Sequence, residues 1–546
     1  MVTALLVGCA AGPAPDAGAG DDVGPDRAAE ARAAADAGEY GYALELLMAS
    51  LDDEPGDPAV ARQAAQLALA MDRQDAAARA ASRWLALAPE SRQAAQVAVV
   101  AALRGDDPAR AAELLYDRLV GNARDPVRAW VGAVALLAQA EAPDAARRAL
   151  ELALARAEQP EPGLGTYLNS MLAAHEERRD EAWGLAERAY ELYPGYERAM
   201  WAARLAQRLD RPAVALDYFE RALTHRSDDR AAAVGQVRML QQLDRPADAL
   251  ARLAGLPMDD ELLYTRGLLQ QELGRLAEAG ATWQRLASLE GDGAGPRHAW
   301  LTGLLAELLE MREQALNWYQ RVDGSLEARA TLRRAILLGD LGRLEPARRL
   351  LAEVRSGSDP DLGERAWLVE GRLLGDAGAF DEAIALYSDA LTRLPGSTEL
   401  LYARAMAAVR AEQLPLAEQD LRAIIQNDPD NAVALNALGY TLADLTDRHR
   451  EALRLIETAL DLEPDNAAIL DSMGWVLYRL DRPEAALPYL RQAAAADPHP
   501  EIVAHLVEVL WVLDRRDEAR EWVARFGSAH GQEAVFADTL KRLGIE

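Results

Sequence analysis

The side chains best suited to acid–base or metal chemistry are seven histidines and one cysteine, spread thinly over 546 residues. His175 is followed by Glu176 and Glu177 but by no second histidine four positions after it, so the zinc-protease helix pattern is absent. A lone cysteine and scattered histidines do not form a structural zinc site. We therefore predict that the chain is not an enzyme and has no catalytic residue, metal or cofactor. The histidines are His175, His225, His298, His449, His499, His505 and His530.

The elements that carry these residues are predicted to be helices. Half of the residues are hydrophobic but only 5% are aromatic, and Ala and Leu outnumber the β-branched residues that favour strands. The formal net charge of −29 argues against a nucleic-acid partner, which requires clustered Lys and Arg. Acidic residues along helices form a solvated face. The positive residues are almost entirely Arg rather than Lys. Adaptation to a salty medium and GC-rich coding are two explanations of this bias, and the sequence leaves both open.

An internal repeat runs through nearly the whole chain. An alanine followed four positions later by another apolar residue recurs at intervals of 30 to 36 residues, with a mean of 34. Such a period is typical of stacked helical hairpins, each of which buries its apolar face against its neighbours. Fifteen units follow from the alanines Ala43, Ala77, Ala112, Ala146, Ala182, Ala215, Ala249, Ala279, Ala315, Ala347, Ala383, Ala417, Ala452, Ala486 and Ala519.

One unit shows the physical basis of the repeat. Gly371 and Ala383 are small where two helices of a hairpin would cross, Gly378 permits the turn between them, and Pro395 ends the second helix. The larger residues of the same unit are expected to fill the space between hairpins, namely Trp367, Leu374, Phe380 and Tyr387. The unit resembles the tetratricopeptide-repeat (TPR) consensus at Trp367, Gly371, Leu374, Gly378, Phe380, Ala383, Tyr387, Ala390 and Pro395.

This resemblance implies an all-α fold, a TPR α-solenoid that forms a right-handed superhelix of about fifteen helical hairpins and binds proteins. We expect the solenoid over residues 28–527 and a C-terminal capping helix over 528–546. The tripeptides Asp210-Arg211-Pro212, Asp244-Arg245-Pro246 and Asp481-Arg482-Pro483 are predicted to replace the glycine turn, with Pro starting the second helix. Residues 159–163, 291–296 and 356–363 are predicted to be longer loops.

The N-terminus resembles the lipobox of bacterial lipoproteins. Residues 1–9 form a short apolar run that ends in Leu6-Val7-Gly8-Cys9, and residues 10–27 are rich in Ala, Gly, Pro and Asp, as in a flexible tether. The resemblance implies a signal peptide over 1–9, whose start we expect to lie upstream, and lipidation of Cys9. Ala10 in place of Asp favours the periplasmic face of the outer membrane. The alternative is a frayed apolar terminus with an incidental cysteine.

A protein-binding groove is predicted on the first helices of the C-terminal hairpins. These positions combine aromatic rings, which supply contact area, with polar groups that can hydrogen-bond an extended peptide. An alternative is that Trp475 and Tyr478 only pack against the neighbouring hairpin. The lysine clamp with which some TPR modules hold a C-terminal carboxylate is absent. The candidate groove residues are Tyr402, Met406, Asn436, Tyr440, Asp471, Trp475, Tyr478 and Arg479.

The segment from Leu435 to Leu480 is similar to the large TPR lipoproteins of Gram-negative bacteria. One studied type is an adaptor that presents peptidoglycan hydrolases to a periplasmic carboxyl-terminal processing protease. The resemblance implies a lipid-anchored scaffold with these partners, held at the membrane by its N-terminal lipid only. The alternative is a TPR lipoprotein that supports polysaccharide or protein export across the outer membrane.

Overall fold

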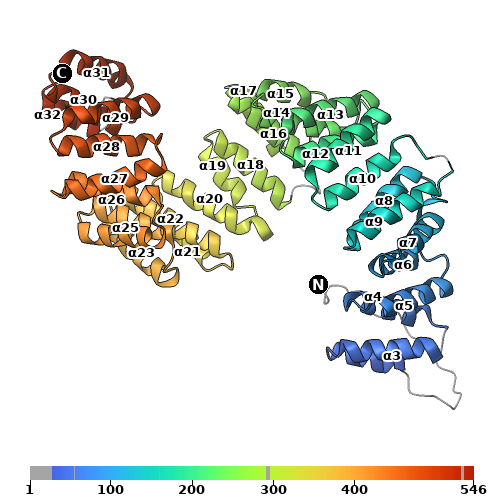
Figure 1. The fold of residues 1–546 in the computed structure, drawn as a ribbon. Coiled ribbons are helices and arrows are strands. Elements are labelled where there is room, and N and C mark those ends of the chain that lie inside the picture. Colours follow the sequence, from blue (N-terminus) through green and yellow to red (C-terminus); the bar gives the residue numbers. More distant parts are fainter. Residues whose placement is uncertain (1–26, 54–55, 159, 290–294, 531–533, 546) are drawn as a thin grey trace. The chain divides into compact units, whose positions relative to one another are not determined.

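The computed structural model describes residues 27–53, 56–158, 160–289, 295–530 and 534–545 (Figure 1). Cys9 and the predicted tether up to residue 26 lie outside the described residues. Within the described ranges the chain forms 31 α-helices and no strand, and 79% of the structure is helical. The all-α prediction is therefore confirmed. No helix in these ranges is both long and apolar enough to cross a membrane.

The described residues form two compact units, and the boundary between them falls within α16. The first unit extends to Leu262 and includes Glu272–Arg275. Its hairpins are α2 (Arg27–Asp36) with α3 (Tyr40–Asp53), α4 (Pro58–Ala70) with α5 (Gln74–Leu87), α6 (Arg92–Arg104) with α7 (Pro108–Leu114) and the π-helical η1 (Leu115–Val120), α8 (Pro126–Gln139) with α9 (Pro143–Ala155), α10 (Leu164–His175) with α11 (Arg179–Leu192), α12 (Tyr196–Arg208) with α13 (Pro212–His225), and α14 (Arg230–Gln242) with α15 (Pro246–Leu253).

The second unit contains Leu263–Gln271 and the chain from Leu276 onward. It ends with α32, which packs on α30 and buries Phe536. Its helices are most of α16 (Asp260–Glu272), α17 (Leu276–Ala287), α18 (Pro296–Leu308), α19 (Arg312–Tyr319), the short η2 (Gly324–Leu326), α20 (Glu327–Asp340), α21 (Leu344–Arg355), α22 (Pro360–Asp376), α23 (Phe380–Arg393), α24 (Thr398–Arg410), α25 (Leu414–Asn427), α26 (Ala432–Leu445), α27 (His449–Leu462), α28 (Ala467–Arg479), α29 (Pro483–Ala496), α30 (Pro500–Val512), α31 (Arg516–His530) and α32 (Ala534–Leu543).

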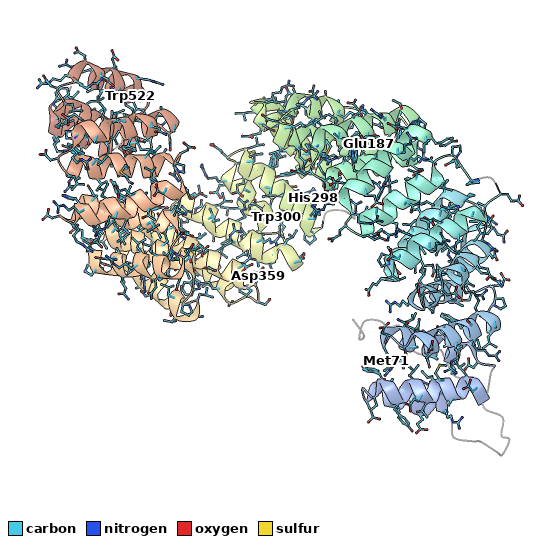
Figure 2. All side chains as sticks on the ribbon, viewed as in Figure 1. Met71, Glu187, His298, Trp300, Asp359 and Trp522 are labelled. Carbon is cyan, nitrogen blue, oxygen red and sulfur yellow. The ribbon has the colours of Figure 1, made fainter. Side chains whose placement is uncertain are left out.

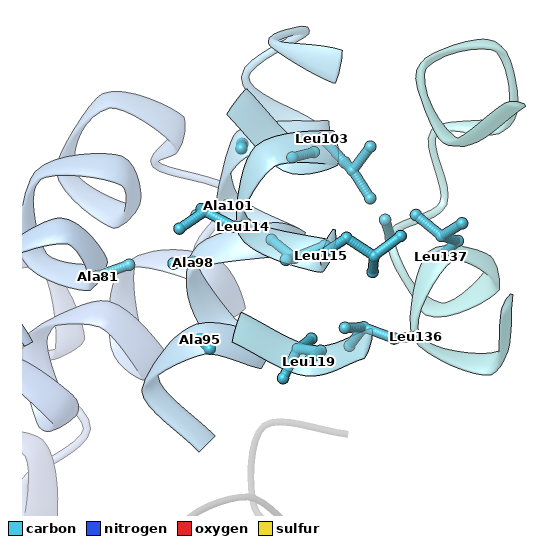
Figure 3. Packing of buried hydrophobic residues seen from close by; sticks show 14 of the residues in the cluster. Ala81, Ala95, Ala98, Ala101, Leu103, Leu114, Leu115, Leu119, Leu136 and Leu137 are labelled. Carbon is cyan, nitrogen blue, oxygen red and sulfur yellow. The ribbon is translucent and has the colours of Figure 1, made fainter. Parts of the chain in front are cut away.

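The fifteen periodic alanines each lie in the second helix of a hairpin, and none is more than 2% exposed. A methyl group at these positions lets the two helices approach closely, whereas longer side chains fill the space toward the next helix. Figure 3 shows this packing in the first unit, where leucines of η1 point toward leucines of α8. The period read from the sequence therefore locates the closest helix crossings.

The turns within hairpins follow the predicted rule. Asp210, Asp244 and Asp481 have φ angles of 54°, 53° and 60°, in the left-handed region that glycine occupies in the Gly378 turn. The following helices begin at the prolines of the same tripeptides, where the missing N–H is not needed. An acidic residue with positive φ thus substitutes for glycine at these turns.

Three details differ from the sequence-based expectation. The ring of Tyr387 does not fill the space between hairpins, because it lies over Gly371 within its own hairpin. The loop expected over 356–363 is shorter, since Asp359 caps α22 and Pro360 begins it. Helix α31 continues to His530, beyond the expected start of the capping segment, and α32 follows as a separate helix.

Candidate functional site

The eight predicted groove residues lie on three first helices of consecutive hairpins in the second unit. Tyr402 and Met406 belong to α24, Asn436 and Tyr440 to α26, and the other four to α28. Helix α28 packs against both α26 and α30, so side chains from alternate helices meet on this face. The contacts of these residues divide them into two groups.

Asp471 of α28 is paired with His505 of α30. The Nδ1 atom of His505 lies 3.0 Å from each carboxylate oxygen of Asp471, and the two residues are only 5% and 7% exposed. Burial lowers the pKa of His505, whereas the negative charge and the hydrogen bond of Asp471 raise it. The raising effects together are larger, so the net pKa shift is upward. The pair is therefore an internal polar contact between two hairpins.

Trp475 covers the imidazole of His505. The two rings are stacked with centroids 4.0 Å apart and planes inclined by 19°. The indole Nε1 of Trp475 donates a hydrogen bond to Asp444 at 3.1 Å, and Arg479 donates to the carbonyl oxygen of Asp444 at 3.0 Å. Trp475 is 7% exposed. It packs against the neighbouring hairpin, which is the alternative that the sequence left open.

Tyr440 and Tyr478 also have partners on α30. The hydroxyl of Tyr440 donates to Glu501 at 2.5 Å, and that of Tyr478 donates to Glu508 at 3.1 Å. Glu508 accepts two further bonds from Arg542 of α32, at 2.7 and 2.6 Å. Burial and the nearby Glu501 raise the pKa of Tyr440, while burial and Glu508 raise the pKa of Tyr478 to about 12. Both phenols are therefore neutral donors near pH 7.

Tyr402, Met406 and Asn436 form the second group, and each is half-buried. The amide oxygen of Asn436 is shielded from solvent and accepts no hydrogen bond within the described part of the chain. Burial raises the pKa of Tyr402, so its hydroxyl is a neutral donor or acceptor. These three side chains, rather than Asp471 or Trp475, leave surface and bonding capacity for a partner.

Sequence reasoning missed the α30 residues that complete this face, His505, Glu501 and Glu508, together with Asp444. The repeat period could have identified His505 as a partner of Asp471, because His505 lies one mean repeat length, 34 residues, after it. Another histidine is also structural: His298 of α18, labelled in Figure 2, is 3% exposed. Its ring lies edge-on to that of Trp318, with ring centroids 5.5 Å apart. Among the described residues, no group of three or more His, Cys, Asp or Glu could hold a metal ion.

A family model described as tetratricopeptide repeat matches residues 332–398, 402–467 and 472–530. These three ranges of the chain are therefore TPR repeats. The hairpins outside these ranges have the same two-helix architecture and buried alanine, and the fold is a TPR solenoid. TPR proteins are protein-binding scaffolds and are typically non-catalytic, and no enzyme family is indicated for this one.

The TPR repeat-containing protein PA4667 of Pseudomonas aeruginosa is 41% identical to this chain over 128 residues. The match covers 23% of this chain and 22% of the relative, so the chain spans about a fifth of that protein's length. Among solved structures, the thermophilic TPR protein TTC0263 of Thermus thermophilus is 25% identical, covers 33% of this chain and 97% of its own, and has a TM-score of 0.30. Naa15/Naa10 bound to HypK-THB is 13% identical, with coverage of 91% and 94% and a TM-score of 0.37.

Proposed function

We propose that this protein is a lipid-anchored adaptor on the periplasmic face of the outer membrane, where it brings a carboxyl-terminal processing protease together with peptidoglycan hydrolases. Two features of the sequence support the proposal. The Leu6-Val7-Gly8-Cys9 run resembles a lipobox, and the segment from Leu435 to Leu480 is similar to that of the large envelope TPR lipoproteins. The proposal places the binding of partners on the TPR hairpins and the membrane attachment on Cys9.

The observation that carries the binding role is the surface that Tyr402, Met406 and Asn436 keep accessible on the first helices α24 and α26. The side chains of Tyr402 and Met406 can supply contact area to a bound segment, and the amide of Asn436 can hydrogen-bond its backbone. This arrangement suits a scaffold that binds segments of other proteins.

The binding role is tested by crosslinking the tagged full-length protein in the native host and purifying it from envelope fractions. The test variant combines Tyr402→Ala, Met406→Ala and Asn436→Ala. A matched control combines Arg454→Ala and Glu457→Ala, which change exposed positions on α27, a second helix. We expect the wild type and the control to recover a processing protease and cell-wall hydrolases, and the test variant to lose them.

Other outcomes separate the two parts of the proposal. Recovery of a secretin or an export porin in place of the protease would favour the export scaffold instead. Recovery of the same partners by all three proteins would show that Tyr402, Met406 and Asn436 are not the binding surface. The anchor is tested separately with Cys9→Ser, which should abolish incorporation of labelled palmitate and release the protein from outer-membrane fractions.

A further inference from the structure

Two arginines of the first unit occupy equivalent positions on neighbouring first helices. Arg204 lies on α12 and Arg238 on α14, and the 34 residues between them equal the mean repeat length. Both are exposed, and neither has a carboxylate within ion-pair distance among the described residues. Nearby arginines differ: Arg198 pairs with Glu161 at 2.7 Å, and Arg226 pairs with Glu197 at 3.0 Å.

Arg204 and Arg238 line one cavity of about 490 Å³. Met200 and Val234 lie one helical turn before the two arginines and provide apolar wall, while Gln207 adds an amide. Phe219 of α13 is also in the wall and lies directly against Gly235, where a Cβ atom would overlap its ring. The cavity thus combines apolar surface with an amide and two guanidinium groups, a mixture that is typical of ligand-binding pockets.

The charge in this cavity is opposite in sign to that of the chain. Its lining contains Arg204, Arg230 and Arg238 against two carboxylates, which gives a local charge of +1 in a chain of net charge −29. Arg230 is already paired with Asp259, one of the two carboxylates. Arg204 and Arg238 are therefore the charges that remain for a ligand, and a guanidinium binds a carboxylate through two parallel hydrogen bonds.

We propose that this cavity binds an extended acidic peptide segment of a partner protein, with Arg204 and Arg238 each holding one of its carboxylates. Arg204 and Arg238 stand on successive first helices, so an extended segment that crosses both helices can present one carboxylate to each arginine. A nucleic acid is a poorer occupant because the net charge of −29 repels a long polyanion. The inference rests on the proposed adaptor function and adds a partner chemistry to it.

The inference is tested by fluorescence anisotropy with the full chain and two labelled twelve-residue probes. One probe carries glutamates at three-residue spacing in an alanine–serine background, and the other has glutamine at those positions. The test variant is Arg204→Gln with Arg238→Gln. The control is Arg179→Gln with Arg252→Gln, which removes the same charge from exposed arginines on the second helices α11 and α15. Equal thermal midpoints of the two variants verify that both are folded.

We expect the glutamate probe to bind the wild type and the control within twofold of each other, and the test variant at least tenfold more weakly. The binding should weaken as salt is raised, because the contacts are ionic. Equal binding of the glutamine probe, or equal loss in both variants, would overturn the inference. Inorganic polyphosphate that competes more strongly than the unlabelled glutamate peptide would also overturn it, in favour of a phosphate ligand.

The envelope crosslinking experiment described above distinguishes this inference from the proposed function. If Arg204→Gln with Arg238→Gln still recovers the processing protease while the wild type fails to bind the glutamate probe, only the peptide site is wrong. If the probe binds as expected and no protease is recovered by the wild type, the peptide site stands and the adaptor role fails.

Discussion

Asp471 and His505 stand one repeat length apart in the sequence and meet in the structure, with the imidazole Nδ1 3.0 Å from both carboxylate oxygens. The contact joins the first helix of one hairpin to the first helix of the next, and Trp475 closes it off from solvent by stacking on the imidazole. Equivalent positions of two successive hairpins thus form an ionisable pair.

The pair should make stability depend on pH. Because the folded-state pKa of His505 is raised, its stabilisation is fully present below the ordinary histidine pKa of about 6.5 and is lost as pH rises through the folded value. We expect the thermal midpoint of the wild type to exceed that of His505→Gln most at pH 5.5, and the difference to shrink toward pH 9. Differential scanning calorimetry across this range checks it, and a constant difference would contradict the role of His505.

The close approach of Tyr387 to Gly371 should make that glycine intolerant of a side chain. A Cβ atom there would overlap the phenol ring, so Gly371→Ala should destabilise by about 1–3 kcal/mol. Gly184 on α11 is the control, because no atom lies within 4 Å of a Cβ built there. Gly184→Ala should be neutral or stabilising by up to about 1 kcal/mol. If Gly371→Ala and Gly184→Ala lowered the thermal midpoint equally, the packing of Tyr387 on Gly371 would not be the reason for the glycine.

The buried ion pair between Arg404 and Asp420 should be costly to break. Two hydrogen bonds of 2.8 and 2.7 Å join the groups, and the Asp420 side chain is 2% exposed. Arg404→Met leaves that carboxylate uncompensated and should cost about 3–5 kcal/mol. Arg372→Met breaks an exposed pair with Asp376 and should cost below about 0.5 kcal/mol. Urea denaturation compares the two, and adding Asp420→Leu to Arg404→Met should restore part of the loss.

The acidic turn residues should tolerate glycine but not a β-branched residue. Asp481 has a φ of 60°, where a β-branched side chain is strained and glycine is not. We expect Asp481→Val to lower the thermal midpoint and cost roughly 1–2 kcal/mol. Asp481→Gly should leave the midpoint unchanged or raise it. If Val and Gly behaved alike at this position, the backbone conformation would not be the reason for the aspartate.

The helical hairpins could be predicted from the sequence because their spacing depends on local requirements. An alanine at each helix crossing and an Asp-Arg-Pro or glycine turn are recognisable without knowledge of the rest of the chain. Glu141, Glu177 and Glu310 also adopt positive φ, and the sequence did not indicate them, since glutamate is not a usual left-handed residue.

The candidate site was less predictable because it depends on which helices meet. The repeat spacing predicted Asp471 and Trp475 as groove residues of α28, whereas the structure buries both side chains against His505 of α30. Their exposure depends on α30, which supplies His505, and the repeat pattern does not reveal how tightly α30 approaches. Tyr402, Met406 and Asn436, on the preceding helices, keep accessible surface, so they remain predictions for a binding site.

The hydrogen bond from Tyr440 to Glu501 links residues 61 positions apart and passes over an entire intervening hairpin. In an array with contacts only between neighbours, stability is a sum of single-repeat and nearest-neighbour energies, and the terminal repeats fray first. The bond between Tyr440 of α26 and Glu501 of α30 adds an interaction energy between second neighbours. Opening the hairpin of α30 and α31 therefore also breaks a contact with α26, two hairpins away. Backbone amides of α26, α28 and α30 should therefore exchange with solvent deuterium together, as one cooperative block at the end of the chain.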